Sequence, residues 1–139
     1  MTDYEIVHTM TDYYDGPRGG VANFGGKPHV YESEWADGEN PKCDTFLLSP
    51  ISDDTLKLAL EDWRIWLKWR EAFDRGEVDS ETHPALPEDR ARHEELEAVL
   101  KKALEVDPDA AIRVTGEFKA LEESSLQSGY MAVRWTVVE

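Results

Sequence analysis

The chain has little cysteine, little positive charge and no long apolar run. Cys43 is the single cysteine among 139 residues, so neither an intramolecular disulfide nor a cysteine-rich zinc site can form within the chain. No segment approaches the roughly 18 consecutive apolar residues of a membrane-spanning helix, and the first residues lack the basic and apolar regions of a secretory signal. We therefore expect a cytoplasmic protein without a membrane segment.

Basic side chains are half as numerous as acidic ones, with 15 Lys and Arg against 30 Asp and Glu, which leaves a formal net charge of −15. This balance argues against nucleic acid as a partner, because phosphate contacts from basic side chains supply most of the affinity there. An acidic decoy or inhibitor of a basic partner stays open. The bases between Arg90 and Lys102 alternate with acids, which favours an ordinary solvated surface over a continuous acidic strip.

The remaining composition is that of a folded domain. Hydrophobic residues make up 40% of the chain, and they include five Trp, five Tyr and four Phe. A chain of this length buries about 68–70% of the surface that it exposes when unfolded. We expect one domain spanning residues 1–139.

The first 35 residues predict a strand and a hairpin. Residues 4–10 are rich in β-formers, and a turn signal follows at Asp15-Gly16-Pro17-Arg18. Gly25 and Gly26 can adopt the positive φ of a two-residue hairpin loop. A loop of these two glycines pairs Phe24 with Lys27 and Gly20 with Tyr31.

Period-two alternation then separates the two faces of this hairpin. The face that carries its aromatic side chains, Phe24, Tyr31 and Trp35, also carries Arg18 and His29. Aromatic faces mostly serve packing, so the simplest interpretation is the inner face of a sheet. Charged groups are costly to bury without partners, so Arg18 and His29 mark either the rim of the core or the polar edge of a pocket.

A long helix is predicted from Ser52 to about Arg75, with Ser52 as N-cap and Gly76 as its end. Its apolar stripe comprises Leu56, Ala59, Leu60, Trp63, Trp66, Leu67 and Phe73, with Ile65 and Trp69 outside the stripe. The apolar surface is therefore wider than one sheet covers. The helix either contacts a second element, most obviously the next helix, or presents apolar surface to a partner.

The second helix begins near Pro87 and ends near Glu105, with Leu96, Val99, Leu100 and Ala103 on one side. Two alternating segments, residues 112–121 and 130–138, predict a terminal antiparallel hairpin. Together these elements predict an α+β fold, in which an antiparallel sheet or small, partly open barrel, built from the N-terminal strands and the C-terminal hairpin, packs against two antiparallel helices.

Six residues are candidates for ligand or partner binding: Tyr14, Asp15, Arg18, His29, Tyr31 and Trp69. An imidazole can accept or donate a proton and Arg18 can hold a carboxylate or phosphate in two places, so the hairpin face has the groups for small-molecule binding or proton transfer. Trp69 represents the exposed side of the tryptophan-bearing helix, where a protein partner or a second copy of the chain can dock.

Recognised catalytic and cofactor patterns are missing from the sequence. The four histidines have no metal-ligand spacing, and the glycines of residues 16–26 match no phosphate-binding motif. Cys43 lies in a polar stretch without a nucleophile motif. We expect no catalytic residues, no metal and no cofactor, and the sequence favours a non-enzymatic protein.

Two blocks carry a resemblance to other proteins. Tyr14-Asp15-Gly16-Pro17-Arg18 with Pro28-His29-x-Tyr31-Glu32-Ser33, and the later Thr82-His83-Pro84-Ala85-Leu86-Pro87, resemble a family of small uncharacterised bacterial proteins with no known function. The likeness covers about the first two thirds of the chain. It implies a bacterial, cytoplasmic origin and transfers no functional residue.

The function that these observations favour is a binding or protein-interaction module. Its contact surface is expected to include the turn 14–18 and the exposed side of the tryptophan-bearing helix. A small-molecule-binding protein or enzyme that uses the hairpin face of residues 14–35 is the alternative, and the acidic decoy is the third hypothesis.

Overall fold

The computed structural model describes residues 4–13, 17–34, 45–120 and 131–138. The elements follow the order β1 (Glu5–Tyr13), β2 (Pro17–Phe24), β3 (Lys27–Ser33), β4 (Thr45–Pro50), α1 (Asp53–Asp74), α2 (Arg90–Ala103), β5 (Ile112–Ala120) and β6 (Met131–Val137), with short 3-10 turns at Ser80–Thr82 and Pro87–Asp89. None of the described helices is long and apolar enough to cross a membrane.

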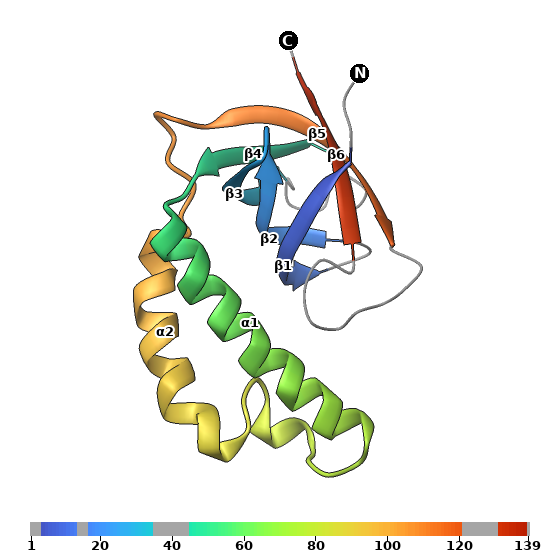
Figure 1. Cartoon of the computed structure of the whole chain (residues 1–139), viewed down its shortest axis with the longest axis vertical. Coiled ribbons are helices and arrows are strands. Elements are labelled where there is room, and N and C mark those ends of the chain that lie inside the picture. Colours follow the sequence, from blue (N-terminus) through green and yellow to red (C-terminus); the bar gives the residue numbers. More distant parts are fainter. Residues whose placement is uncertain (1–3, 14–16, 35–44, 121–130, 139) are drawn as a thin grey trace.

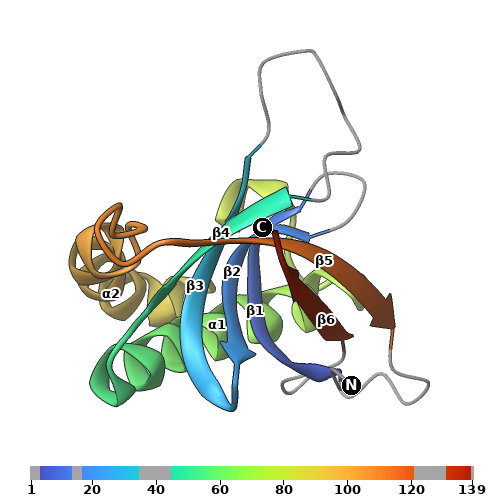
Figure 2. The same ribbon diagram turned by 90° about the horizontal axis from the view of Figure 1, so that it is seen from above.

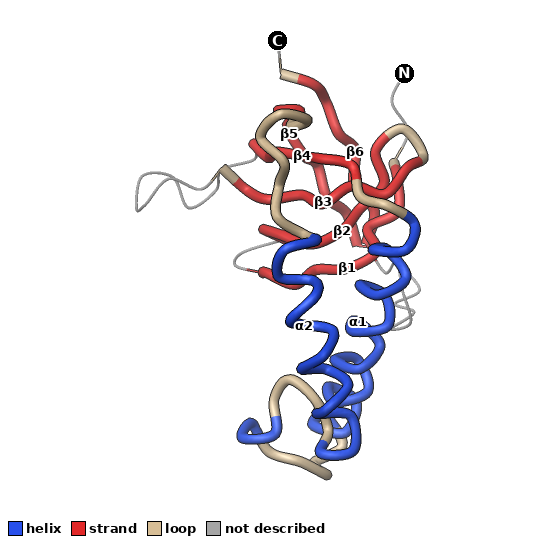
Figure 3. The backbone as a smooth tube through the Cα atoms, turned by 90° about the vertical axis from the view of Figure 1, so that its left-hand side faces the viewer, coloured by secondary structure: helices blue, strands red, loops and turns tan. Residues whose placement is uncertain are grey.

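The six strands form a closed antiparallel barrel in sequence order, and the two helices project from it as an antiparallel pair (Figures 1 and 3). Closure comes from β1 and β6, which pair over Glu5 with Val133, Ile6 with Ala132, and Val7 with Met131. The predicted α+β class with two helices is confirmed. The barrel is closed rather than partly open, because the first strand reaches the last one.

The hairpin of β2 and β3 has the predicted register. Phe24 pairs with Lys27, and the pairing continues through Gly20 with Tyr31. Gly25 and Gly26 have φ of +63° and +79°, as the tight loop requires. Their backbone amides donate to the carboxylate of Glu5 at 3.0 and 2.8 Å, so β1 also holds the tip of the hairpin.

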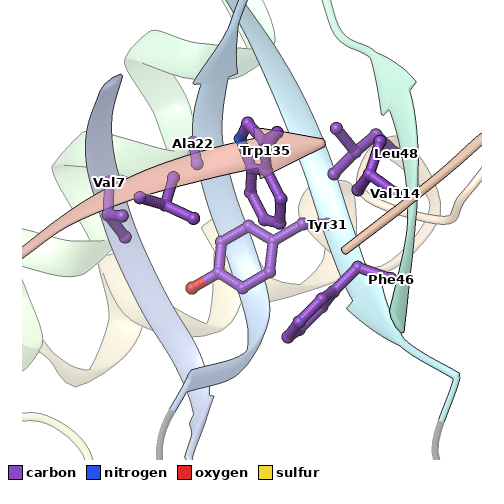
Figure 4. Packing of buried hydrophobic residues seen from close by; sticks show 8 residues of the cluster. Val7, Ala22, Tyr31, Phe46, Leu48, Val114 and Trp135 are labelled. Carbon is purple, nitrogen blue, oxygen red and sulfur yellow. The ribbon is translucent and has the colours of Figure 1, made fainter. Parts of the chain in front are cut away.

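The aromatic face of this hairpin points into the barrel. Tyr31 lies at the centre of the core, beside Phe46 and Trp135 (Figure 4). Its ring centroid lies 5.8 to 6.0 Å from those of Phe46, Phe118 and Trp135. The buried residues of this cluster are Val7, Ala22, Tyr31, Phe46, Leu48, Val114, Val133 and Trp135. The interpretation of this face as the inner face of the sheet is confirmed for the described residues.

The hydroxyl of Tyr31 is hydrogen-bonded to the backbone of β1. Its hydroxyl donates to the carbonyl of Thr9 at 2.9 Å, and the hydroxyl of Thr9 accepts from the amide of Val21 at 2.9 Å. Gly20 passes so near this point that a Cβ atom there would lie 2.3 Å from the Thr9 carbonyl oxygen, and its φ is +153°. Only glycine fits between these strands without a shift of the backbone.

Helix α1 begins and ends where its sequence predicts. The side chain of Ser52 accepts from the amide of Thr55 at 3.1 Å, and Gly76 ends the helix with a φ of +74°. One side of α1 covers the outer face of the barrel beside β1 and β2 (Figure 2), where Ala59 belongs to the same buried cluster as Val21. The hairpin is therefore buried on both faces in this region.

The predicted apolar stripe of α1 is wrong at Phe73. Ile65, predicted outside the stripe, contacts the second helix as expected, whereas Trp69 does not lie on an exposed side of the helix. Ile65 and Trp69 are buried, whereas Phe73, assigned to the packed stripe, is 43% exposed. The reason is that α1 contacts the barrel, α2 and the loop before α2 on different sides, so no single stripe describes it. Trp69 packs with Ala72, Leu86 and Val78, which places it under that loop.

Helix α2 begins three residues later than Pro87, after the 3-10 turn. Leu96 and Leu100 are buried against α1 and the barrel, as expected. Val99, predicted on the packed side, is 52% exposed. The packed face of α2 is therefore a narrow stripe, and the two helices are not in close contact along their whole facing surfaces.

Candidate site in the cleft between the two helices

A cleft of about 620 Å³ lies where α1, α2, β1 and the loop before α2 converge. Its walls come from Met10 of β1, from the α1 positions 59, 62, 63 and 66, from the loop residues 83 and 84, from the α2 positions 93, 97, 100 and 101, and from Leu104, the C-cap of α2. The spacing on each helix is three and four residues, so each presents one face to the cleft. This volume lies within the range of small-molecule sites.

His93 is the polar centre of the cleft. The residue is 8% exposed, and its ring bridges the two helices. Nδ1 lies 2.7 Å from Oδ1 of Asp62 on α1, and Nε2 lies 3.0 Å from Oε2 of Glu97, one turn further along α2. The Glu97 side chain is 69% exposed, whereas that of Asp62 is 22% exposed. His93 is thus held on its inner side by Asp62 and contacted on its outer side by a solvent-exposed carboxylate.

Two stacked indoles form the aromatic wall. The rings of Trp63 and Trp66 lie 5.0 Å apart at an angle of 17°, and the guanidinium of Arg70 lies 5.5 Å from the Trp66 centroid. This stack runs along α1. Because Trp63 covers one face of Trp66 and Arg70 approaches the ring as well, a ligand meets mainly the edges of these indoles. The wall supplies apolar contact area rather than a free ring face for a cation.

The loop before α2 closes the far end of the cleft and is held by side chains from both helices. The indole Nε1 of Trp69 donates to Oγ1 of Thr82 at 2.7 Å, and Arg90 donates to the carbonyl of Thr82 at 2.8 Å. The ring of His83 meets Trp69 edge to face at 4.7 Å, and its Nε2 accepts from Trp66 Nε1 at 3.4 Å. Trp69 therefore positions the loop that carries His83 into the wall of the cleft.

An exposed ion pair joins the helices next to the cleft. Arg92 donates from Nε and Nη2 to the carboxylate of Glu61 at 2.6 and 2.8 Å. These hydrogen bonds hold the pKa of Glu61 below its ordinary value and raise the pKa of Arg92. The pair limits how far α2 can swing from α1 at this level.

Not all of the predicted site residues lie together. Tyr31 and His29 lie on one face of β3, inside the barrel, and Trp69 lies under the loop at the cleft. Arg18 is the second residue of β2 and is 8% exposed. Tyr14 and Asp15 lie outside the described residues, as do Trp35 and Cys43.

The groups expected to bind on the hairpin face are engaged in packing. Tyr31 is 1% exposed and its hydroxyl is bonded to Thr9, while the His29 ring meets Phe24 edge to face at 5.3 Å and has its Nδ1 2.9 Å from the carbonyl of Lys27. These contacts give Tyr31 and His29 a structural role. At these two positions the hairpin face is filled by packed side chains and does not form the wall of a pocket.

Sequence reasoning did not find the cleft. Asp62 and His93 are 31 residues apart and meet only because α1 and α2 pack as they do. The sequence did contain one signal. His93 and Glu97 are spaced so that they share one face of their helix, and Trp63 and Trp66 share one face of the other helix in the same way. Within the described part of the chain, no three His, Cys, Asp or Glu side chains are grouped to hold a metal ion.

Comparison of the chain with protein-family models, with curated proteins and with solved structures finds no match. The resemblance of the two sequence blocks to a bacterial family therefore remains an expectation.

Proposed function

We propose that this protein is a non-enzymatic binding module of the bacterial cytoplasm, and that its recognition site is the cleft between α1 and α2, where it takes a small organic molecule. One observation carries the proposal. A largely apolar cleft of about 620 Å³ has His93 at its centre, with Asp62, Glu97, His83 and Lys101 around it. A mostly apolar cavity with a few convergent polar groups is the usual form of a small-molecule site.

The same geometry speaks for binding rather than catalysis. An Asp and His pair can move protons, but acyl or phosphoryl transfer also needs a nucleophile or an anion-stabilising set of donors nearby. The described side chains lining the cleft include no Ser, Thr or Cys. Both ring nitrogens of His93 already contact carboxylates. The cleft is thus equipped to orient a ligand.

A protein partner or a second copy docking on the tryptophan-bearing helix has less support. Trp69, which motivated that hypothesis, is 6% exposed and donates its indole hydrogen to Thr82. Phe73 is the aromatic residue of α1 that solvent reaches most, at 43%. One such ring is ordinary for a protein surface.

Ligand-observed NMR with a mixture of neutral, cationic and anionic organic fragments tests the proposal. The blocking variant is Leu104→Trp, which adds volume to a half-buried wall of the cleft. Its matched control is Val99→Trp, in the helix that Leu104 caps, at a residue that is 52% exposed and outside the cleft. Circular dichroism melts of both variants show whether each is folded.

We expect fragments that bind the unmodified protein to lose their signal with Leu104→Trp and to keep it with Val99→Trp. Equal binding by the two folded variants would place the fragments elsewhere. Absence of any fragment binding to the unmodified protein would remove the proposal. If Leu104→Trp does not fold, the unmodified protein answers the same question. Two fragments that bind in the cleft should compete with each other, and both should show intermolecular NOEs to the indole protons of Trp63 and Trp66.

A further inference from the structure

The contacts of His93 describe what kind of ligand the cleft takes. A neutral imidazole has one N–H donor and one acceptor nitrogen, whereas an ionised carboxylate only accepts. Nδ1 and Nε2 both lie within hydrogen-bond distance of a carboxylate oxygen, at 2.7 and 3.0 Å. Both hydrogen bonds exist together when the ring carries two protons. In that state the outer nitrogen is a charged donor that faces the cleft.

The two carboxylates on this ring are not equivalent. Asp62 is half-buried between the helices, with a side chain that is 22% exposed, and a carboxylate on Nδ1 is a usual means of fixing the orientation of an imidazole. The Glu97 side chain is 69% exposed, and its carboxylate approaches Nε2 to 3.0 Å. An exposed pair of this kind contributes little to stability. Glu97 can therefore leave Nε2 at small cost.

We infer that the cleft binds a small organic carboxylate with an apolar body, and that the Glu97 side chain occupies the position of the ligand's carboxylate when the cleft is empty. This inference rests on the proposed function of the cleft. On binding, the carboxylate of the ligand replaces that of Glu97 and accepts from Nε2 of His93. No covalent bond changes in this step.

Lys101 supplies the second positive charge. It lies one turn after Glu97 and two turns after His93 on α2, and it lines the same cleft. An ammonium there can meet the second oxygen of a carboxylate held on His93. The apolar body would then contact Met10, Trp63 and Leu100, which are apolar residues of the cleft lining.

Both negative and positive charges lie near the proposed anion site. The net charge of −15 repels anions at long range, but screening at physiological salt has a length of about 8 Å, so the nearest groups decide. The groups that face His93 are Asp62 from α1, Glu97 and Lys101 from α2, and His83 from the loop. With Glu97 displaced into solvent, the protonated ring and Lys101 outweigh Asp62.

Three probes that share one apolar body test the inference: phenylacetate, phenylacetamide and phenethylamine, titrated calorimetrically into the full chain at about pH 6, where an ordinary histidine is substantially protonated. We expect phenylacetate to bind most tightly. Glu97→Ala removes the internal competitor and should tighten phenylacetate binding roughly fivefold, the upper end of what an exposed ion pair contributes. Lys101→Met should weaken it roughly fivefold.

Matched controls lie beside each of these positions. Glu94→Ala removes an exposed acid of α2 that is outside the cleft, and Lys102→Met removes the neighbouring exposed base. Both should leave the affinity for phenylacetate within about twofold, because screening weakens charges that do not touch the ligand. All four positions are exposed, so these variants are expected to fold.

Other outcomes separate this inference from the proposed function. Tighter binding of phenethylamine that Glu97→Ala weakens would overturn the carboxylate inference and still support the cleft as a binding site. If none of the three probes binds while other fragments compete at the cleft, the inference also fails and the proposed function stands. An unchanged phenylacetate affinity in Glu97→Ala would equally overturn the role of Glu97.

Discussion

Trp69 was a candidate for partner contact, and its environment predicts a structural role with a measurable size. Replacement of Trp69 by Phe removes the hydrogen bond of 2.7 Å from indole Nε1 to Thr82 Oγ1, a loss of about 1 kcal/mol. The smaller ring also buries roughly 40 Å² less apolar surface, which is worth about 1 kcal/mol. We expect Trp69→Phe to lower the free energy of unfolding by about 2 kcal/mol.

Urea unfolding followed by circular dichroism measures this change, and two further variants isolate its cause. Phe73→Leu alters the exposed ring that stacks on Trp69 at 5.1 Å and should cost less than about 1 kcal/mol. A double-mutant cycle of Trp69→Phe with Thr82→Val should show a coupling of about 1 kcal/mol, because each single variant removes the same hydrogen bond. A loss below about 0.5 kcal/mol for Trp69→Phe, or no coupling with Thr82, would refute the structural role.

Three more predictions concern the barrel and the helix pair. Gly20→Ala should destabilise the fold by about 3 kcal/mol in urea unfolding, because its Cβ would lie 2.3 Å from the Thr9 carbonyl oxygen; a neutral effect would contradict the strand contact. Tyr31→Phe should cost about 1–2 kcal/mol in the same assay by leaving that carbonyl without the hydroxyl donor, and a stability gain would argue against a structural hydroxyl. Arg92→Gln should raise the NMR-measured pKa of Glu61 toward its ordinary value. Because the pKa of Glu61 is lower in the folded state, the ion pair adds a small stabilisation of the fold at pH values above the unfolded pKa, and this stabilisation is lost as the pH falls through the folded pKa. An unchanged pKa of Glu61 in Arg92→Gln would show that Arg92 does not hold the carboxylate.

Local signals in the sequence were sufficient for the register of the hairpin and the ends of α1. Gly25 and Gly26 permit a two-residue loop, and once the loop is known the pairing follows by counting. Ser52 and Gly76 act through their nearest neighbours along the chain. Such features depend on a few adjacent residues, so one sequence is enough to predict them.

Features that depend on several packed elements were not predicted. Closure of the barrel needs β1 to reach β6 across more than 110 residues of chain. The apolar positions of α1 do not form one stripe, because Ile65 and Trp69 face α2 and the loop while Ala59 faces the barrel. Helical periodicity reports an apolar face but not which of several neighbours covers it.

The candidate site shows the same limit. Arg18, His29 and Tyr31 share a face, as the alternation of β-strands requires, but the surrounding rings of β4, β5 and β6 turn that face into a core. His93 was seen only as one histidine without ligand spacing. Its role in the candidate site depends on its contact with Asp62 on another helix, and only tertiary packing brings these two residues together.

The central claim is that recognition takes place between the helices and not on the hairpin face. A titration of the ¹⁵N-labelled protein with phenylacetate, followed by proton–nitrogen correlation NMR, tests it most directly because the indole and backbone signals report each region separately. We expect shifts at the Trp63 and Trp66 indoles and at the amides around His93 and Glu97, with those of His29 and Tyr31 unchanged. Shifts concentrated at His29 and Tyr31, with the cleft signals unmoved, would contradict it.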